Sequence, residues 1–210
     1  MKIFIKEQIG EADRYTIENE PVTSIDLMER ASEAIAGWIS KHIDIQTPLL
    51  FIAGKGNNGG DGLAVARILC MEGYGCSVYL VYGREVMSEE CRINLERLPS
   101  GVSFADNLTD TDGRAVIVDA LFGSGISGKV REPAASVISQ INRLKNKVIS
   151  IDLPSGMGAE PPAHPCPCGE TETEALQTVR ADITLTLEFP KLAMMFPETG
   201  EYAGAVTVLP

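Results

Sequence analysis

Three glycine-rich turns, each carrying a carboxylate, follow three apolar segments of the sequence. The turns are GKGNNGGDG at residues 54–62, DALFGSGISGK at residues 119–129 and DLPSG at residues 152–156. The apolar segments have the length and composition of buried parallel strands. Ligands bind outside the carboxyl ends of the strands in such a sheet, so the three turns predict one polar ligand site at that edge.

Asp119 and Asp152 are the candidate reactive carboxylates, because each follows directly on an apolar segment. A partly desolvated carboxylate at the edge of a sheet can coordinate a hard cation or move a proton. The alternative is that each carboxylate only caps the loop after its strand. Asn58 and Ser155 add neutral oxygens at the same edge, and this donor set suits a weakly charged cation better than zinc.

The first turn contains GKGNNG, which matches the dinucleotide-binding pattern G-x-G-x-x-G. It is not a Walker A loop, because Gly60 and Asp61 occupy the places of Lys and of Ser or Thr. Backbone N–H groups of small residues before a helix form a site for pyrophosphate, and the alternative is a tight turn with Asp61 as the helix N-cap. After the next predicted strand, Arg84 is a candidate for a 2′-phosphate and Glu85 for a ribose hydroxyl, unless both are only solvated.

The remaining candidate side chains are few. Of the two histidines, His42 falls at the end of a predicted helix, where it complements the helix dipole, and His164 lies in a proline-rich segment. Neither a Ser-His-Asp triad nor a histidine-rich metal centre is therefore predicted. The HPCPC run at residues 164–168 lacks the C-x-x-C spacing of a zinc site. Lys191, after the fifth predicted strand, is one more candidate for the site, or else a solvated surface lysine.

The elements that must position these residues alternate along the chain. Apolar runs predict strands at residues 48–53, 77–82, 115–118, 148–151, 183–187 and 205–209, and helical periodicity predicts helices from residue 25 and at residues 63–71, 88–98 and 133–145. Thr23 and Asp26 suit a capping box, and Ser88 suits an N-cap. The alternation predicts an α/β fold with a largely parallel sheet covered on both faces. Residues 157–174 hold four of the 12 prolines and are expected to form a surface loop.

The composition is that of a globular domain, with 210 residues, 44% hydrophobic and 22% charged. The net charge of −11 argues against a nucleic acid or an anionic membrane as the partner. No stretch approaches the roughly 18 apolar residues of a membrane span, and the amino terminus lacks a signal-peptide core. The five cysteines have no framework spacing, which suits a reducing compartment. We expect a single cytoplasmic domain over residues 1–210.

These motifs resemble the NAD(P)H-hydrate epimerase family, whose domain is also called the YjeF amino-terminal domain. The resemblance rests on GNNGGDG at residues 56–62, DALFGSG at 119–125 and IDLPSG at 151–156, and it extends to LMERA at 27–31, RADITLTLEFPK at 180–191 and YAGAVTV at 202–208. It covers nearly the whole chain. The resemblance implies a three-layer α/β/α Rossmann-like fold. It also implies an isomerase for nicotinamide-cofactor repair, which interconverts the R and S forms of hydrated NADH and NADPH (NADHX and NADPHX) at C6.

The resemblance further implies the residues of the site. The expected substrate-binding residues are Asn57, Asn58, Gly59, Gly60, Asp61, Gly123, Ser124, Gly125, Ile126, Ser127, Gly128, Lys129 and Asp152. A potassium ion, K⁺, is expected at Asn58, Asp119 and Ser155. Asp152 is the expected general acid and base, with Lys191 as a second proton carrier.

The sequence also departs from the family pattern. Family members usually continue the D-x-P-S-G motif with Gly-Leu-Asp and a later Asp-Thr-Gly, whereas residues 156–160 here are GMGAE. Many bacterial members form the first half of a chain with a nucleotide-dependent dehydratase, so a dehydratase acting on the S epimer is the expected partner. The alternative function is a non-catalytic nucleotide-binding or protein-interaction module of the same fold. A dehydrogenase is disfavoured, because the later strand ends offer no base besides Lys191. A homodimer through the first predicted helix stays open.

Overall fold

A seven-stranded, all-parallel sheet forms the centre of the molecule in the computed structural model, which describes residues 6–20, 22–126, 128–159 and 177–210. The strands lie in the order β3-β2-β1-β4-β5-β6-β7. Their bounds are β1 Leu49–Ala53, β2 Cys76–Leu80, β3 Ser103–Phe104, β4 Val116–Ala120, β5 Val148–Ile151, β6 Ile183–Leu187 and β7 Ala205–Leu209. The predicted parallel α/β sheet is confirmed, and β3 adds a short edge strand that the apolar pattern does not reveal.

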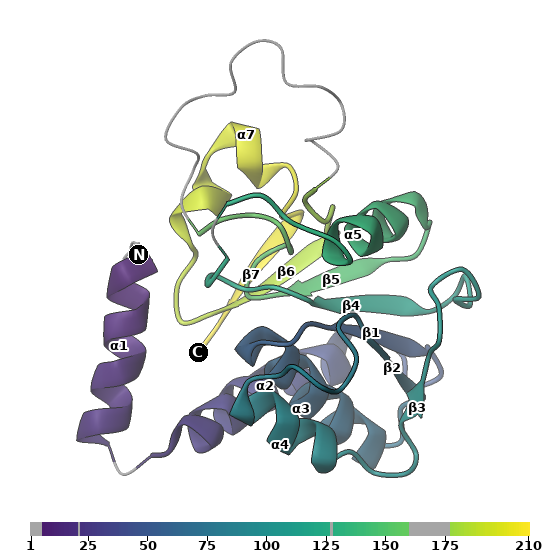
Figure 1. Cartoon of the computed structure of the whole chain (residues 1–210), viewed down its shortest axis with the longest axis horizontal. Helices are drawn as coiled ribbons and strands as arrows, with labels where there is room; N and C mark the ends of the chain where they lie inside the picture. The colour runs from purple at the N-terminus through teal and green to yellow at the C-terminus, as the bar shows by residue number, and fades with distance from the viewer. Residues whose placement is uncertain (1–5, 21, 127, 160–176) are drawn as a thin grey trace.

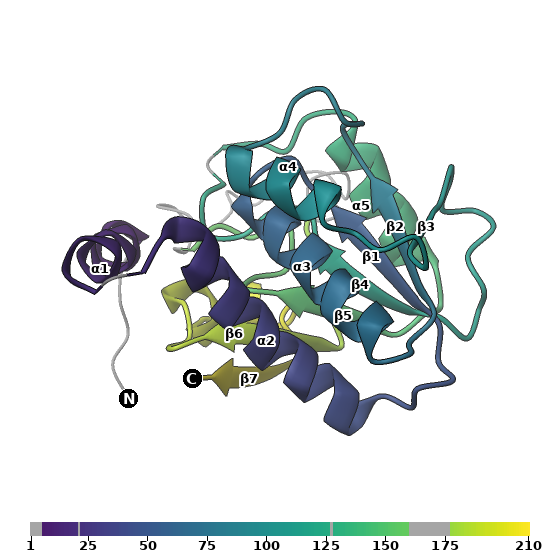
Figure 2. The ribbon, with the colours of Figure 1, turned by 90° about the horizontal axis from the view of Figure 1, so that it is seen from below.

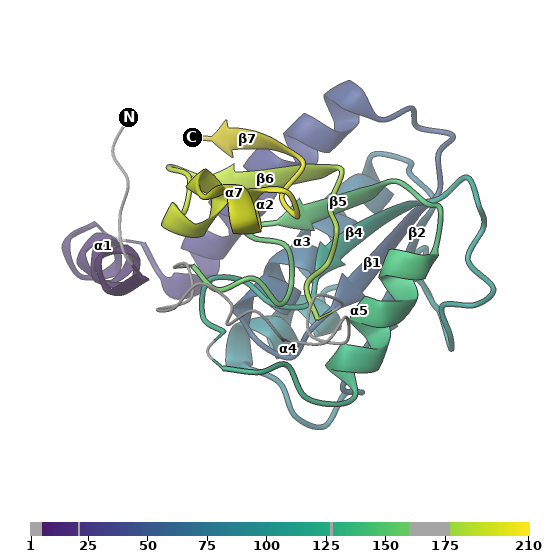
Figure 3. The same ribbon diagram turned by 90° about the horizontal axis from the view of Figure 1, so that it is seen from above.

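Helices cover both faces of the sheet (Figure 1). One face carries α2 (Ser24–His42), α3 (Asn57–Met71) and α4 (Glu89–Glu96), as Figure 2 shows, and the other carries α5 (Ala134–Arg143), as Figure 3 shows. Alternate side chains of β1 point to opposite faces of the sheet. Phe51 packs in the cluster beneath α2 and α3, and Leu50 and Ile52 pack in the cluster beneath α5. The predicted three-layer architecture is confirmed.

The remaining helical segments lie outside these layers. They are α1 (Lys6–Asn19), the 3₁₀ helix η1 (Leu192–Met195) and α7 (Pro197–Gly200). The helix α1 lies at one side of the molecule, its described side chains are almost all exposed, and it has too few apolar residues for periodicity to predict it (Figures 1 and 2). The expected capping box of Thr23 and Asp26 on α2 and the N-cap Ser88 on α4 are both present.

Two expectations about element boundaries are wrong. The helix α3 begins at Asn57, not Leu63, so most of the GNNGGDG motif forms its first turns. Its N-cap is Gly56, and Asp61 therefore does not cap the helix. The strand β4 runs to Ala120, so Asp119 lies inside the strand and not after it. Apolar periodicity misplaces both boundaries because glycine and carboxylate residues continue each element at the site.

Some expectations lie beyond what the structure describes. Ser127, His164, Cys166 and Cys168 fall outside the described residues, as does most of the expected surface loop. The apolar face of α2 packs into the core of its own chain, and a homodimer and a single domain over residues 1–210 stay predictions. Within the described residues, no helix is long and apolar enough to cross a membrane.

Gly62 sets how closely α3 approaches β4, since a Cβ at this position would overlap that of Ala120. We expect Gly62→Ala to lower the free energy of unfolding by about 1–3 kcal/mol through overpacking. Gly37→Ala in α2 is the matched control, because open space surrounds Gly37 and alanine is the better helix former. It should raise stability by up to about 1 kcal/mol. Urea unfolding measures both, and shifts in the same direction would contradict the close approach.

Candidate active site

The carboxyl ends of β1, β4, β5 and β6 lie side by side and bring the predicted site residues to one edge of the sheet. The first turn of α3 follows β1, the segment 121–124 follows β4, and the segment 152–155 follows β5. The strand β1 has β2 on one side and β4 on the other, so the chain connects in one direction along the sheet from β1 to β3 and in the opposite direction from β4 to β7. The topological switch point therefore lies at β1. Ligands of open α/β sheets bind at such points.

Asp119 is a buried carboxylate that accepts hydrogen bonds on both oxygens. Its Oδ2 accepts from Ser150 Oγ at 2.8 Å and from Ser155 N at 2.9 Å. Its Oδ1 accepts from Ser155 Oγ at 2.5 Å and from Leu121 N at 3.3 Å. Burial raises the pKa of Asp119 above its ordinary value, and the hydrogen bonds from Ser155 and Ser150 oppose that rise. The carboxylate thus ties β4 to β5 and to both following loops.

Ser155 connects Asp119 to the segment after β4. Its hydroxyl accepts from Phe122 N at 2.8 Å and lies 3.2 Å from Phe122 O. The next residue, Gly123, is hemmed in, because a Cβ there would lie 3.2 Å from Asn58 Oδ1 and 2.8 Å from Asp152 Oδ2. Asn58, Asp119, Ser155 and Asp152 therefore surround one short segment, and a side chain at Gly123 would displace that of Asp152 or Asn58.

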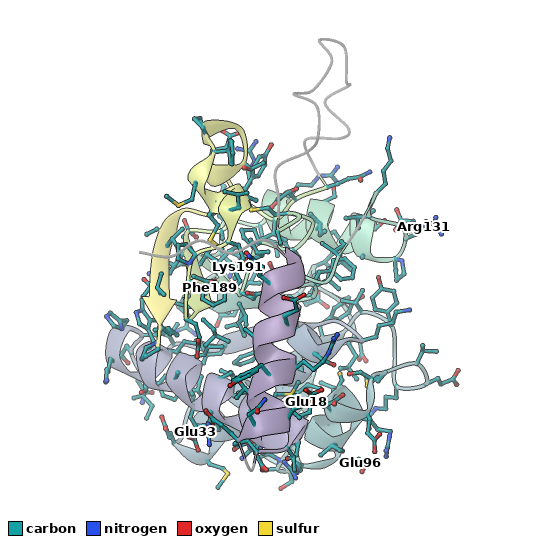
Figure 4. The ribbon with its side chains drawn as sticks, turned by 90° about the vertical axis from the view of Figure 1, so that its left-hand side faces the viewer. Glu18, Glu33, Glu96, Arg131, Phe189 and Lys191 are labelled. Atoms are coloured by element: carbon teal, nitrogen blue, oxygen red, sulfur yellow. The ribbon has the colours of Figure 1, made fainter. Side chains whose placement is uncertain are left out.

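Asp152 and Lys191 form a buried ion pair at the same edge. Asp152 Oδ1 lies 2.8 Å from Lys191 Nζ, and the two side chains are 16% and 4% exposed. The other oxygen, Oδ2, accepts from Ser124 N at 2.8 Å. Lys191 Nζ also donates to Thr186 Oγ1 at 2.9 Å and lies 5.3 Å from the centre of the Phe189 ring (Figure 4). Lys191 is therefore not the solvated surface lysine of the alternative interpretation.

Two backbone turns place this pair. Asp152 has a φ of +67° and Glu188 a φ of +62°, a left-handed conformation that residues other than glycine rarely adopt. The turn at Glu188 brings the chain back under the end of β6, so Lys191 Nζ comes within 3.3 Å of Leu187 O. Strained backbone of this kind gathers at functional sites. Sequence patterns do not reveal it, since neither residue is a glycine.

The two expected substrate loops differ in exposure. In the first turns of α3, Gly59 and Gly60 are buried against Gly54 and Met28, whereas Asn57 is exposed. Asn58 is half-buried, and within the described residues its Nδ2 finds no hydrogen-bond partner. The loop after β4 is described at Gly123, Ser124, Gly125, Ile126, Gly128 and Lys129. Its Ser124 amide contacts Asp152, which joins this loop to the ion pair.

Sequence reasoning missed three residues that hold the site together: Ser150, Thr186 and Phe189. Ser150 faces Asp119 in the register of β4 with β5, and Thr186 accepts the hydrogen bond from Lys191. The available signal was the presence of polar residues in two otherwise apolar strands, Ser150 in β5 and both Thr184 and Thr186 in β6. Such a residue needs a buried partner, but the partner becomes known only with the strand order.

Other candidate groups do not join this site. Burial raises the pKa of Cys76 to about 12 and that of Cys91 to about 11, so neither thiol is an activated nucleophile. His42 lies in the last turn of α2 and stacks on Trp38, and its role with the helix dipole stays a prediction. Across the part of the chain that the structure describes, no three His, Cys, Asp or Glu side chains gather as a metal site.

Residues 24–193 match the model of the YjeF-related protein N-terminus family. The chain belongs to this family. It is 35% identical to an NAD(P)H-hydrate epimerase of Oenococcus oeni, over 96% of this chain and 92% of that protein. It is 34% identical to a bifunctional NAD(P)H-hydrate repair enzyme Nnr of Salinibacter ruber, over 94% of this chain but 38% of that protein. The crystal structure of yeast ynu0 has the same fold, with a TM-score of 0.74 at 21% identity, covering 99% of this chain and 87% of the yeast chain.

The buried pair gives a direct stability prediction. Lys191→Met leaves the Asp152 carboxylate without its cation, and we expect the free energy of unfolding to fall by about 3 kcal/mol. The double variant Asp152→Asn with Lys191→Met should recover part of that loss, because no unpaired charge remains. Urea unfolding of the wild type, of Asp152→Asn and Lys191→Met alone, and of the double variant measures the coupling.

Arg114→Met is the matched control, because it breaks the exposed ion pair with Asp112, whose atoms lie 2.8 Å apart. Exposed pairs contribute little to stability, so this variant should unfold at the wild-type urea concentration. An equal loss for Lys191→Met and Arg114→Met would show that Lys191 is not buried in a pair.

Proposed function

We propose that the protein is an NAD(P)H-hydrate epimerase, which interconverts the R and S forms of NADHX and NADPHX at C6. The observation that carries the proposal is the buried pair of Asp152 and Lys191 at the ligand edge of the sheet. Similarity to curated epimerases over nearly the whole chain supports the same reaction. The family model alone would leave open whether this chain keeps the reactive groups.

The reaction needs acid and base chemistry at the oxygen that leaves C6 and at the oxygen that returns to it. C6 carries a hydroxyl and is bonded to the ring nitrogen, so its configuration is lost either when the hydroxyl leaves to give an iminium ion or when the ring opens. In the first route a proton goes to the departing oxygen, and water then adds to the other face of C6 as a base removes a proton. Asp152 carries both transfers in this proposal, because the planar iminium ring turns about its bond to ribose and presents its other face to the same carboxylate.

Lys191 and Ser124 fix the working carboxylate. Lys191 holds Asp152 Oδ1, and the Ser124 amide holds Oδ2, so the carboxyl group cannot rotate away from a ring bound beside Gly123. Lys191 Nζ can pass a proton to Oδ1 along the 2.8 Å contact and is the second proton carrier. Such fixed positioning is what general acid and base catalysis requires.

The substrate diphosphate is assigned to the first turn of α3 and the loop after β4. Backbone N–H groups at a helix N-terminus attract phosphate, and Gly56 as N-cap leaves that end of α3 open. This local site accounts for an anionic substrate on a protein of net charge −11. Asn57, Asn58, Asp61 and Lys129 supply the polar side chains of these loops.

A potassium ion fits the residues around Phe122. Asn58 Oδ1, the Asp119 carboxylate and Ser155 Oγ offer oxygen ligands, whereas Asn58 Nδ2, which has no partner in the described part of the chain, is a donor left for an acceptor on the substrate. Asp119 already accepts four hydrogen bonds, yet the Ser155 hydroxyl can turn toward Phe122 O at 3.2 Å and free one oxygen lone pair. The ion would supply positive charge that orients the loop and the substrate phosphates.

A dehydratase that acts on the S epimer is the partner we propose. The bifunctional repair enzyme of Moorella thermoacetica is 29% identical over 99% of this chain, which covers 40% of that protein. Epimerisation alone only equilibrates R and S forms. A reaction that consumes one of them gives it direction.

The epimerase proposal is tested by supplying pure (R)-NADPHX together with a dehydratase specific for the S epimer. We expect the protein to accelerate consumption of the R epimer, and Asp152→Asn to lose at least about 100-fold of that acceleration. The matched control is Asp44→Asn, because Asp44 is exposed and accepts a hydrogen bond from Gln46 N that asparagine can keep.

The alternative of a non-catalytic module predicts another outcome. Consumption of (R)-NADPHX would then equal the spontaneous rate with wild type, Asp152→Asn and Asp44→Asn alike, while a nucleotide still raised the melting temperature. That result would overturn the epimerase proposal.

Potassium is tested by thermal unfolding of the full chain in KCl and in choline chloride of equal ionic strength. A bound ion should raise the melting temperature by roughly 5 °C, because it binds only the folded protein. Ser155→Ala should remove the response. Ser150→Ala should keep it, since Ser150 contacts Asp119 without belonging to the proposed ligands. Equal melting temperatures in both salts for the wild type would contradict the site.

A further inference from the structure

The edge of the sheet that holds the candidate active site also continues from β1 in the other direction, away from Asp152. From β1, the edge leads through β4 and β5 to Asp152 on one side, and through β2 to β3 on the other. Four side chains with cationic or aromatic groups lie at or just after the carboxyl ends of β1, β2 and β3. They are Lys55 after β1, Tyr82 and Arg84 after β2, and Phe104 at the end of β3.

Aromatic rings hold both cations in place. Lys55 Nζ lies 5.1 Å from the centre of the Tyr82 ring, and Arg84 Cζ lies 4.5 Å from the centre of the Phe104 ring. Gly83 has a φ of +69° and turns the chain directly before Arg84. A ring fixes the position of a cation but leaves its N–H donors free for an anion.

Neither cation has a carboxylate partner. Among the described residues no ion pair involves Lys55 or Arg84, whereas Arg67 pairs with Glu29 and Arg92 pairs with Glu96. Lys55 and Arg84 follow neighbouring strands of the sheet, so two cations without a carboxylate partner in the described part of the chain lie along one edge. Their chemistry suits a phosphate group, which accepts hydrogen bonds from several donors at once.

The strand order says where along the substrate such a phosphate lies. With the nicotinamide ring at Asp152 and the diphosphate at the first turn of α3, the adenosine half extends past β1 toward β2. NADPHX carries a phosphate on the 2′-oxygen of that adenosine, and NADHX carries a hydroxyl there. We infer that Lys55 and Arg84 bind the 2′-phosphate and make the protein select NADPHX over NADHX, an inference that rests on the proposed function.

Binding of adenosine fragments tests the inference without any turnover. Calorimetry of the full chain with 2′,5′-ADP and with 5′-AMP should show at least about tenfold tighter binding of 2′,5′-ADP. Lys55→Ala and Arg84→Ala should each weaken 2′,5′-ADP about tenfold and leave 5′-AMP unchanged, since a charged hydrogen bond is lost in each. Arg92→Ala is the matched control, because it removes an exposed arginine that is paired with Glu96.

Three results would overturn the inference: equal affinity of the wild type for both fragments, equal weakening of both fragments by Arg84→Ala, or the same loss of 2′,5′-ADP binding in Arg92→Ala. The epimerisation rate with each substrate separates this inference from the proposed function. Tighter binding of 2′,5′-ADP than of 5′-AMP without any epimerisation would contradict the proposed function and support the phosphate site. Epimerisation with equal KM values for NADHX and NADPHX, and with both KM values unchanged in Arg84→Ala, would contradict the phosphate site and support the proposed function.

Discussion

The buried carboxylate of Asp119 is the constraint on which the ligand edge depends. A charge inside an all-parallel sheet is costly unless hydrogen bonds satisfy it, and Asp119 receives them from Ser150, from both groups of Ser155 and from Leu121. These donors come from β5 and from the loops after β4 and β5, so satisfying one carboxylate fixes the relative position of three segments. The rest of the site is built on those segments.

This network also positions the ion pair of Asp152 and Lys191. The Ser155 hydroxyl accepts a hydrogen bond from the backbone N–H of Phe122. Of the next two residues, Gly123 lies against the Asp152 side chain, and Ser124 donates its backbone N–H to the Asp152 carboxylate. Lys191 then reaches the same carboxylate from β6, after the left-handed turn at Glu188. Asp119 and Asp152 thus have different surroundings: the first is buried and accepts four hydrogen bonds, and the second is partly exposed and paired with Lys191. Two carboxylates with such different surroundings suit different roles in one reaction.

Much of this arrangement is predictable from sequence, and the remainder has identifiable physical reasons. Short apolar runs predict the strands, and the turns after them predict that Asn58, Asp119, Asp152 and Ser155 share an edge. The start of α3 is missed because its first turns are rich in glycine, which is a poor helix former. The close packing of α3 on its neighbours nevertheless requires these glycines. The partners of Asp119 and Lys191 depend on strand register and on left-handed residues, which involve positions far apart in the chain. The metal and the proton carriers stay predictions, supported by oxygen donors and by the buried pair.

The central claim is that Asp152, held by Lys191 and Ser124, lets C6 of the hydrated cofactor lose and regain its configuration. The most direct measurement is the ratio of R to S epimer over time, followed by chromatography from each pure epimer of NADPHX with catalytic amounts of the protein. We predict that the sample started from the R epimer and the sample started from the S epimer reach the same ratio of R to S, and that both reach it much faster than without protein. If each pure epimer changes only at its spontaneous rate, the proposed role of the pair is contradicted.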